Sequence, residues 1–547
     1  MLRAGTRQHA VRRIPTPFLH IMPSNNIILT GFMGTGKTAV GQAIAERLGR
    51  WFVDVDAVIE RQAGRPIHQI FAQDGEPAFR ALETEVIRSL TNESNLVIST
   101  GGGALLSPIN RQRLQASGVL VCLRASVDTL LARLADTTNR PLLAGPDRRA
   151  RIATLLAQRA ALYDAIPLQV DTDRLSVPEV AEAVIRLARQ AGPGPQRIPV
   201  IHPAGSYDIL IGEGLLNEAG PALLAAGLAA GACAIVTQPA LIGHASCLAD
   251  ALQAQGFRPT VIEIPAGEQY KTLATVADLY DAFIAAGLDR RSPVLALGGG
   301  VVGDVAGFAA ASFLRGVPFV QIPTSLLAMV DASVGGKTGV DLPQGKNLVG
   351  AFKQPALVLM DPETLASLPS DEFRSGLAEV VKHGMIGDPD LFEVMEGRAV
   401  LALSDLLARA VQVKVDVVQQ DPFEQGRRAV LNLGHTFAHP LETLSNYQMR
   451  HGEAVSIGLV MATRLAARLG VCEAALVVRL ESALERLGLP TRAPGFDPAQ
   501  VVAGMSTDKK RVQGRLRFVL PRALGDVEVF DAVPAADVLM VVESVAS

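Results

Sequence analysis

The sequence predicts an α/β fold in which parallel, doubly wound sheets precede a mainly helical region. From residue 24 onward, short apolar runs alternate with helical patterns, for example 25–32 followed by 38–49 and then 51–56. Strands that alternate with helices in this way form parallel sheets. From about Asp361 the strand signals fade, and helical periodicity dominates in stretches such as 369–386.

The chain length and one segment rich in Gly and Pro predict the domain organisation. A chain of 547 residues is too long for a single hydrophobic core. The segment 189–197 contains two Gly and two Pro between two periodic stretches, which is typical of a linker. We expect a disordered extension over 1–23, a first α/β domain over 24–190, a linker over 191–197, a second α/β part over 198–365 and a helical part over 366–547.

The composition restricts the class of protein and its partners. Hydrophobic residues make up 49 % of the chain and charged residues 19 %, so the chain can bury a core. A net charge of −3 gives no sign of a nucleic-acid surface, and no apolar run reaches the roughly 18 residues of a membrane-spanning helix. The four cysteines form no Cys-x-x-Cys pair, which favours a reducing compartment. We expect small-molecule substrates, neither nucleic acid nor membrane as partner, and a cytoplasmic location.

A phosphate-binding loop follows the first strand. Residues 31–38 match the pattern GxxxxGK[ST] between an apolar strand and a helix, the context that supports this motif. Backbone N–H groups and the helix N-terminus attract phosphates, Lys37 reaches the transferred group, and Thr38 is placed to bind magnesium. A second GKT, at 336–338, has Asp331 six positions before Lys337 and fails the pattern. The expected ATP-binding residues of the loop are Gly34, Thr35, Gly36, Lys37, Thr38 and Ala39.

A second glycine-rich turn lies in the later half of the chain. The strand 293–297 leads into 298–303, which satisfies GxGxxG in a strand–turn–helix context and favours a nucleotide pyrophosphate at the helix start. The acidic residue that usually binds the ribose about 20 residues later is absent. The pattern alone therefore does not identify a dehydrogenase.

Candidate metal ligands follow in the helical region. His435 and His439 stand at i and i+4 on one helix face, a common metal-ligand spacing. Glu379, His451 and Glu453 are further candidates. Each histidine taken singly is more readily explained as a core or surface residue, so the residues leave the ligand set open.

The first half resembles shikimate kinase. The motifs that carry the resemblance are Asp54-Val-Asp56, Phe79-Arg80, the Gly triad 101–103, Arg140-Pro-Leu-Leu and 158–163, in that order over roughly residues 24–190. The resemblance implies that Asp56 contacts the shikimate hydroxyls and acts as base, and that Arg159 lies near the nucleotide and the transferred group. It implies that shikimate is bound by Asp56, Arg80, Gly102, Arg140 and Arg159, with Arg140 on a lid and also near ATP. A gluconate-type or nucleoside monophosphate kinase is the alternative.

The second half resembles 3-dehydroquinate synthase. The motifs lie at 267–271, 298–304, 323–325, 335–347, 375–384, 428–439, 451–455 and 508–510, so the resemblance spans 198–547. It implies conversion of 3-deoxy-D-arabino-heptulosonate 7-phosphate to 3-dehydroquinate and phosphate, with NAD and a metal ion as cofactors. It also implies that Glu379, His435 and His451 bind zinc or cobalt, whereas His439 lies beside the substrate.

The same resemblance assigns the remaining residues of the synthase site and implies a homodimer through the synthase half, and the two resemblances together give the catalytic residues of both halves. NAD is expected at Glu268, Gln269, Tyr270, Lys271, Gly299, Gly300, Val301, Asp304, Thr324, Ser325, Lys337, Lys346, Thr364 and Ser367. The synthase substrate is expected at Asp331, Arg315, Lys337, Lys346, Asn347, Lys382, Lys414, Arg428, Asn432, His439, Lys509 and Lys510. The expected catalytic residues are Lys37, Asp56, Arg159, Lys337, Lys382, Lys414, Arg428 and His439. A substrate with a carboxylate and a phosphate needs paired charge at both ends when it is desolvated, which accounts for the many cations.

Several features leave alternatives open. Ala438 and Pro440 depart from the residues usual around His439, and a proline at 440 crowds the carbonyl of Thr436, which would kink a helix. One half could be a nucleotide-binding module without turnover, or the second half a different sugar-phosphate cyclase or a polyol dehydrogenase. The presence of Lys37, Asp56, the metal ligands and Lys337 favours two working enzymes.

Overall fold

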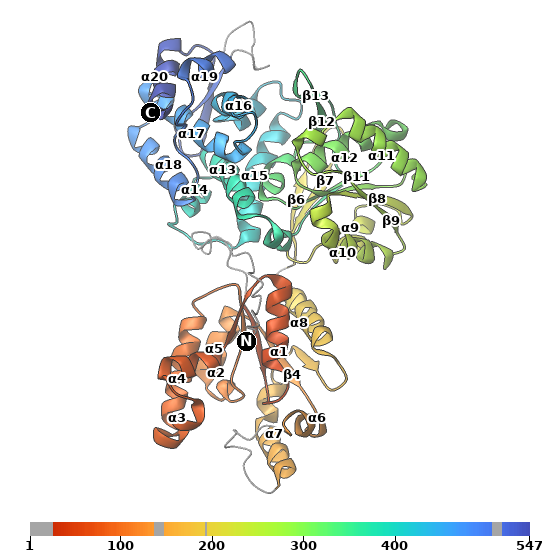
Figure 1. Ribbon diagram of the computed structural model, residues 1–547, viewed down its shortest axis with the longest axis vertical. Helices are drawn as coiled ribbons and strands as arrows, with labels where there is room; N and C mark the ends of the chain where they lie inside the picture. Colours follow the sequence, from red (N-terminus) through yellow and green to blue (C-terminus); the bar gives the residue numbers. More distant parts are fainter. Residues whose placement is uncertain (1–25, 136–146, 192–193, 506–516, 547) are drawn as a thin grey trace, which may run out of the picture. The chain divides into compact units, whose positions relative to one another are not determined.

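The computed structural model describes residues 26–135, 147–191, 194–505 and 517–546 (Figure 1). The chain forms two compact units, one that ends at Gly194 and one that begins at Pro195, and this boundary falls inside the segment predicted as a linker. Each unit contains a sheet with helices on both faces, so the predicted α/β class is confirmed. Within the described ranges, no helix is long and apolar enough to cross a membrane.

The first unit is a five-stranded parallel sheet. Its strand order is β2 (Trp51–Asp54), β3 (Leu96–Ser99), β1 (Asn26–Gly31), β4 (Gly118–Arg124) and β5 (Gln169–Asp171). Its helices are α1 (Lys37–Leu48), α2 (Val55–Ala63), α3 (Ile67–Gln73), α4 (Gly75–Leu90), α5 (Pro108–Ser117), α6 (Val127–Arg133), α7 (Arg148–Asp164) and α8 (Val177–Ala191).

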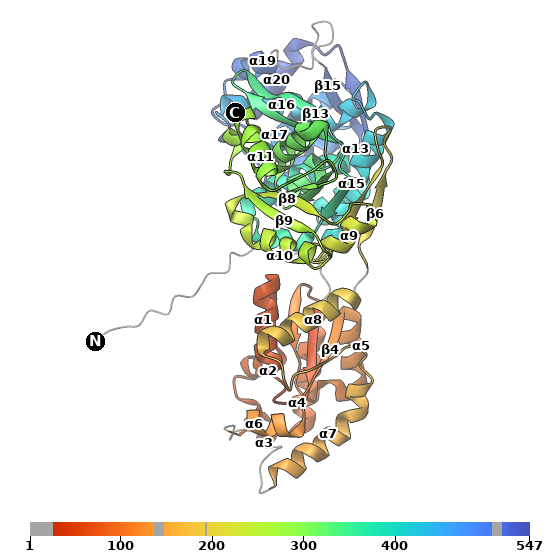
Figure 2. The ribbon, with the colours of Figure 1, turned by 90° about the vertical axis from the view of Figure 1, so that its right-hand side faces the viewer.

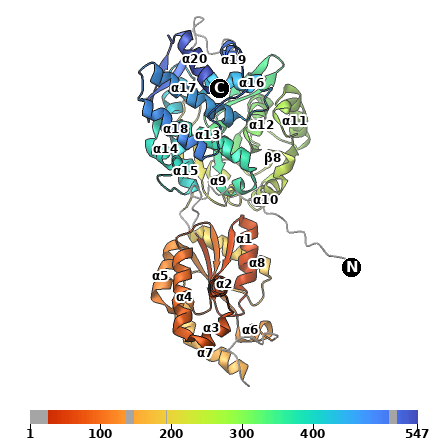
Figure 3. The same cartoon turned by 60° about the vertical axis from the view of Figure 1, so that its left-hand side comes forward.

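Strand β1 shows why this sheet has helices on both faces. Ile27 and Leu29 pack with Ile44 of α1 and Val184 of α8, whereas Ile28 packs on the opposite face with residues of α2, α4, α5 and α7. Because strand side chains alternate between faces, a strand with apolar residues at successive positions must be covered on both. Figure 3 shows α1 and α8 on one side of the strands and α4 and α5 on the other.

The second unit begins with a seven-stranded mixed sheet. Its order is β6 (Gln196–Val200), β7 (Tyr207–Ile211), β14 (Leu357–Met360), β11 (Phe319–Pro323), β10 (Val294–Gly298), β8 (Ala232–Thr237) and β9 (Arg258–Glu263). Only β6 pairs antiparallel within this sheet. Helices α9 (Ala219–Ala225) and α10 (Ile242–Gln253) cover one face, and α11 (Leu273–Ala285) and α12 (Gly300–Ser312) cover the other (Figure 2).

The hairpin of β12 (Lys337–Leu342) and β13 (Gly345–Phe352) is inserted in the chain between β11 and β14 of this sheet. The helical region then runs through α13 (Ser370–Gly387), α14 (Pro389–Met395), α15 (Leu403–Gln420), α16 (His435–Leu444), α17 (His451–Arg468), α18 (Ala474–Arg486), α19 (Pro498–Met505) and α20 (Ala535–Ala546), with a second hairpin of β15 (Phe518–Ala523) and β16 (Asp526–Phe530). Helices α13 and α17 are buried along most of their length and form the centre of this region. Their burial fixes the side chains that they carry, which matters for the site below.

Candidate functional site

The phosphate loop of the first unit has the backbone that its sequence demands. Strand β1 ends at Gly31 and α1 begins at Lys37, and Gly34 and Gly36 between them have φ of 86° and 93°. Only glycine adopts such left-handed angles readily, so both positions require it. The Nζ of Lys37 donates to the carbonyl oxygens of Gly31 at 2.9 Å and Phe32 at 3.0 Å, so the ammonium group lies back over the loop.

Thr38, the expected magnesium ligand, is tied to a carboxylate that sequence reasoning left without a role. Its hydroxyl donates to Asp54 Oδ2 at 2.8 Å, and Asp54 Oδ1 accepts the backbone N–H of Asp56 at 3.1 Å, which caps helix α2. Asp54 therefore joins the phosphate loop to the expected base Asp56. Its place at the end of β2, two residues before that base, was the available signal.

The Gly triad 101–103 brings the shikimate residues together. The carbonyl oxygen of Gly102 accepts from Arg159 Nη1 at 2.8 Å and from the hydroxyl of Tyr163 at 3.0 Å. A Cβ on Gly103 would lie 2.6 Å from Arg80 Nη2, and one on Gly101 would lie 2.8 Å from Asp56 Oδ1. The structure thus gathers three of the predicted side chains, Asp56, Arg80 and Arg159, around one glycine turn. Arg140 lies outside the described residues.

Glu83 is a further buried carboxylate of this site that the sequence did not indicate. It is fully buried, and Arg80 Nη1 donates to its Oε2 at 2.8 Å. Burial raises the pKa of Glu83 even though Arg80 counteracts it. The contact orients the Arg80 guanidinium from beneath, and the i, i+3 spacing of the two residues on α4 was the only sequence signal.

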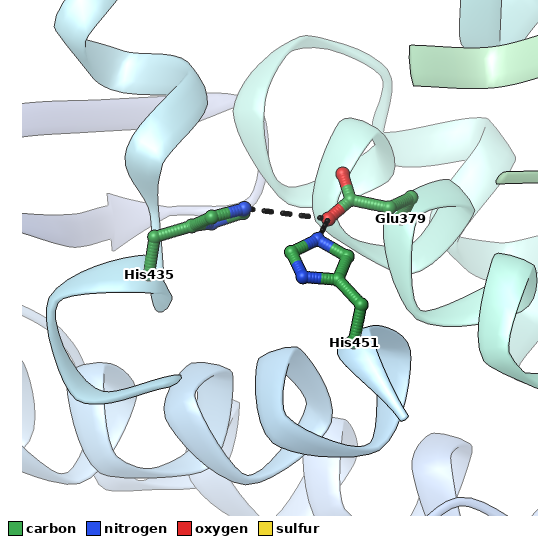
Figure 4. A group of neighbouring side chains, drawn as sticks. All are labelled: Glu379, His435 and His451. Atoms are coloured by element: carbon green, nitrogen blue, oxygen red, sulfur yellow. Dashed lines mark ion pairs between the residues drawn. The ribbon is translucent and has the colours of Figure 1, made fainter. Parts of the chain in front are cut away.

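Three donor atoms converge in the second unit from three different helices. The Nε2 atoms of His435 and His451 lie 3.6 Å and 3.5 Å from Oε1 of Glu379 (Figure 4). Donors that bind one tetrahedral ion at about 2.1 Å lie about 3.4 Å apart, so these separations fit a zinc-like ion. His439 does not belong to this set, although its ring centroid lies 5.5 Å from that of His435. Spacing along one helix was therefore a poorer guide than the family pattern.

The second nitrogen of each histidine is also held. His435 Nδ1 lies 3.1 Å from the carbonyl oxygen of Leu433, and His451 Nδ1 lies 3.2 Å from Glu442 Oε1. Because both acceptors bind a protonated Nδ1, each Nε2 is left to bind a metal ion. Glu442 was not predicted, although it stands seven residues after His435 on the same helix.

The charges around this cluster favour an ionised carboxylate. Burial alone would raise the pKa of Glu379, but the Lys382 ammonium group in contact with it and the neighbouring His451 hold it below its usual range. Burial also opposes the charge of His451, yet its contacts with Glu379 and Glu442 raise the pKa of His451 to about 10.

Helix α16 carries Pro440 without a break. The helix runs from His435 to Leu444 with Pro440 buried inside it, and helix α17 begins at His451. The expected crowding at Thr436 therefore does not end the helix, and His435 keeps its position at the first turn.

A cationic cluster lies beside the metal residues. Lys414 Nζ donates to Asp331 Oδ1 at 2.6 Å and to the Asp331 carbonyl at 2.5 Å, and both Lys414 and Lys382 are buried. Arg428 is buried too and donates to the carbonyl of Gly335 at 3.1 Å. A Cβ on Gly335 would lie 2.4 Å from Arg428 Nη2, so this glycine makes room for the guanidinium.

Other predicted substrate residues lie apart from this cluster or outside the described chain. Lys337 pairs with Glu424, and its side chain is half exposed. Arg315 is exposed, has a left-handed φ of 67°, and has no recorded interaction with the cluster in the described ranges. Asn432 ends a short 3₁₀ turn three residues before His435. Lys509 and Lys510 lie outside the described residues.

Five of the predicted NAD residues, Gly299, Gly300, Val301, Thr324 and Ser325, follow the carboxyl ends of β10 and β11. Gly299 is the N-cap of α12, and the Thr324 N–H donates to the Gly298 carbonyl at 3.0 Å. The buried Lys271 donates to Asp304 Oδ2 and to Asn347 Oδ1, both at 2.6 Å. Asn347, predicted as a substrate residue, thus contacts Lys271, which was predicted to bind NAD.

Lys346, a second lysine of the predicted NAD set, contacts a carboxylate and an aromatic ring. Its Nζ lies 3.3 Å from Glu268 Oε1 and 4.2 Å from the ring centroid of Tyr447. Tyr447 stands between α16 and α17 and was not predicted. Two further predicted NAD residues lie just after β14, where Thr364 donates to the Asp361 carbonyl at 2.7 Å and the Ser367 hydroxyl lies 3.0 Å from His244 Nε2. Gln269 and Tyr270 belong to the 3₁₀ turn 268–270, and Val301 to the first turn of α12.

The chain matches families of known proteins along most of its length. Residues 33–189 match shikimate kinase, residues 261–375 match the N-terminal part of 3-dehydroquinate synthase, and residues 376–511 match its C-terminal part. A 3-dehydroquinate synthase from Synechococcus sp. is 50 % identical over 365 residues, which cover 64 % of this chain and 99 % of that protein.

Two solved structures are similar to parts of the chain. The 2-epi-5-epi-valiolone synthase from Streptomyces hygroscopicus, solved with NAD+ and Zn2+, is 31 % identical with a TM-score of 0.58, covering 64 % of this chain and 99 % of its own. The shikimate kinase from Acinetobacter baumannii, solved with shikimate, is 38 % identical with a TM-score of 0.30, covering 32 % of this chain and 96 % of its own. The chain is a fusion that belongs to the shikimate kinase family in its first half and to the 3-dehydroquinate synthase family in its second, and it carries both activities.

Proposed function

We propose that the synthase half works with NAD and with one zinc or cobalt ion bound by Glu379, His435 and His451, and that the kinase half works with magnesium and ATP at the loop 31–38. The observation that carries the proposal is the convergence of donor atoms from helices α13, α16 and α17, because the Nε2 atoms of His435 and His451 both lie 3.5–3.6 Å from Oε1 of Glu379. A set of two imidazoles and one carboxylate leaves a fourth tetrahedral position for substrate, as in catalytic zinc sites.

The donor chemistry fits such an ion. Both histidines point Nε2 at Glu379, and their Nδ1 atoms are occupied by the Leu433 carbonyl and by Glu442. When bound, the ion would polarise a substrate hydroxyl, and NAD would accept and later return a hydride. The chain itself must bind an anionic substrate, orient it and exclude water.

The buried cations supply the anion binding. Lys414 is held on Asp331 and Lys382 on Glu379, so each ammonium group is already positioned before substrate arrives. Arg428 presents a fixed guanidinium, because its own Nη atoms are anchored on the carbonyls of Pro422 and Gly335. Preorganised charge of this kind stabilises a phosphate or carboxylate in a desolvated site without reorganisation during the reaction. His439, whose ring centroid lies 5.5 Å from that of His435, would exchange protons with the substrate.

NAD would be bound in the second unit by residues at the carboxyl ends of the strands and at the N-terminus of α12. The N-terminus of α12 at Gly299 and Gly300 attracts a pyrophosphate. Lys271 and Asp304 form a buried ion pair behind it, and Lys346 with Glu268 forms a more exposed one. Thr324 and Ser325, just after β11, would contact the nucleotide at the carboxyl end of the sheet.

In the kinase half, the proposed residue roles centre on two glycine-rich turns, the phosphate loop 31–38 and the Gly triad 101–103. Lys37 and the loop N–H groups would bind the transferred phosphate, and Thr38 with Asp54 would bind the magnesium ion. Asp56 would accept the proton of the attacking hydroxyl, while Arg80 and Arg159 would hold the substrate carboxylate and the developing phosphoryl charge.

We also propose a homodimer through the synthase half. The four cysteines are free thiols, which supports the proposal of a cytoplasmic location.

The two activities of the purified full chain test the proposal. A chelator that strips tightly bound zinc should abolish phosphate release from 3-deoxy-D-arabino-heptulosonate 7-phosphate, and added zinc or cobalt should restore it. ADP formation with shikimate should return with magnesium alone. Glu379→Gln should lose the first activity and keep the second, and Lys37→Met should do the reverse. Equal turnover of sedoheptulose 7-phosphate, or full synthase activity in Glu379→Gln, would contradict the assignment.

A further inference from the structure

His383 is a buried histidine that none of the roles above uses. It lies on α13, one residue after Lys382, and has no exposed surface. Neither ring nitrogen has a hydrogen-bond partner among the described residues. Buried polar atoms almost always have a partner, from the protein or from an internal ligand, so this ring calls for one.

The ring faces two residues of the proposed site. One nitrogen of His383, one carboxylate oxygen of Asp331 and one of Glu379 all lie within 4.8 Å of one another. Two atoms that each hydrogen-bond a common water at about 2.8 Å lie about 4.6 Å apart when the angle is tetrahedral. Donors of a shared metal ion would lie about 3.4 Å apart. In the described residues His383 forms no ion pair within 4.0 Å with either carboxylate, so its nearest nitrogen lies between 4.0 and 4.8 Å from them, which suits a shared water. The Nε2 atoms of His435 and His451, at 3.6 Å and 3.5 Å from Glu379 Oε1, suit an ion.

The charges nearby also favour a neutral ligand. Asp331 already contacts the Lys414 ammonium group, and Glu379 contacts that of Lys382. A second divalent ion at this position would lie against two ammonium groups and against the first ion, which Coulomb repulsion disfavours. A neutral imidazole has one donor and one acceptor nitrogen, so either ring nitrogen of His383 can hydrogen-bond a water.

We propose that Asp331, Glu379 and His383 hold one internal water molecule, and that His383 acts through this water as a positioning residue for the metal ligand Glu379. The inference rests on the proposed metal site. An internal water typically makes about three hydrogen bonds to buried polar groups, which is the number offered here. The water links a ligand of the ion to Asp331, the residue that anchors Lys414. The water thereby fixes the position of the Glu379 carboxylate relative to the cationic cluster.

The test measures metal binding rather than turnover. The full chain is stripped of metal and titrated with Co2+ against a chromophoric chelator, and the visible spectrum of the bound Co2+ is recorded. His383→Phe keeps a flat ring but removes both nitrogens, and we expect a 10- to 100-fold loss of Co2+ affinity with an altered spectrum. His383→Gln restores a donor and an acceptor, and we expect affinity within threefold of the unchanged chain. Thr463→Val, which removes another fully buried polar group from the helical region, should leave both readings unchanged.

A crystal structure of the Co2+-loaded full chain completes the test, since it needs no variant to fold. Density for a water among the three residues supports the proposal, and a metal ion there or no density overturns it. Affinity of His383→Phe within threefold of the unchanged chain also overturns it, as does a second tightly bound Co2+ in the synthase half. If the unchanged chain fails to bind Co2+ at Glu379, His435 and His451, the proposed function itself falls. If the unchanged chain binds Co2+ at these residues and His383→Phe binds it with the same affinity, only the inference about His383 is contradicted.

Discussion

The Nδ1 atom of His451 lies 3.2 Å from Oε1 of Glu442, which stands on the preceding helix. Glu442 is buried, and burial alone would raise its pKa, but the contact with His451 together with the nearby His439 and Lys346 holds the pKa below its usual range. A carboxylate behind a metal-binding imidazole fixes the ring and strengthens it as a ligand. The contact links Glu442 of α16 to His451, the proposed metal ligand in the first turn of α17.

Removing this carboxylate should weaken metal binding. We expect Glu442→Ala to lower Co2+ affinity 10- to 100-fold, because such partners of metal ligands typically contribute that much. Glu442→Gln should lose less, since its amide oxygen can still accept from Nδ1. Chelator competition on the full chain measures both. Glu481→Gln, a paired carboxylate elsewhere in the helical region, is the control, and equal losses in it and in Glu442→Ala would contradict the role.

The residues that the sequence pointed to and those it missed differ in a physical way. The phosphate loop lies in one short segment, so its sequence pattern already contains its geometry. Glu442 and Tyr447 contact residues of other elements, His451 on α17 and Lys346 on β13, and only the folded arrangement of these elements reveals those contacts. Asn347 shows the same limit, since a neighbour from a different part of the chain, Lys271, determines what its side chain binds.

The metal set illustrates the point further. Spacing along α16 favoured His435 with His439, but ligand geometry depends on where side chains of three helices meet. Family resemblance supplied the set Glu379, His435 and His451 because it carries information about that meeting point. No pattern of period or spacing in a single chain contains it.

A methyl group at Gly103 should disturb shikimate binding selectively. In Gly103→Ala the new Cβ would lie 2.6 Å from Arg80 Nη2, and the flexible end of Arg80 must move away from Glu83. We expect the KM for shikimate to rise about tenfold, as for loss of a charge-assisted hydrogen bond of about 1.5 kcal/mol. The KM for ATP and the thermal midpoint should change little. Gly194→Ala, where nothing lies within 4 Å of the new atom, is the control, and an unchanged KM for shikimate in Gly103→Ala would refute the placement of Arg80.

The four thiols should react in a fixed order. Burial raises the pKa of Cys122 to about 11 and that of Cys233 to about 12. A raised pKa leaves less of the reactive thiolate at pH 8, so we expect neither to react with a thiol reagent until the chain unfolds. The partly exposed Cys247 should react first, and Cys247→Ser should remove this fast phase. Mass spectrometry of labelled peptides assigns the sites, and early labelling of Cys122 or Cys233 would speak against the buried positions.

The contact between Tyr447 and Lys346 should contribute to NAD binding. The ring of Tyr447 is half exposed, its residue has a left-handed φ of 59°, and Lys346 Nζ lies 4.2 Å from the ring centroid. An exposed cation–π contact contributes about 0.5–1 kcal/mol, so Tyr447→Leu should weaken NAD binding by a factor of about 2–5 while Tyr447→Phe keeps it. Tyr447→Gly separates this role from a structural one. It relieves the left-handed backbone and should raise stability, yet it should weaken NAD binding as much as leucine does. Calorimetric titration of NAD with thermal unfolding measures both quantities, and unchanged NAD affinity in Tyr447→Leu and Tyr447→Gly would rule the contact out as part of the NAD site.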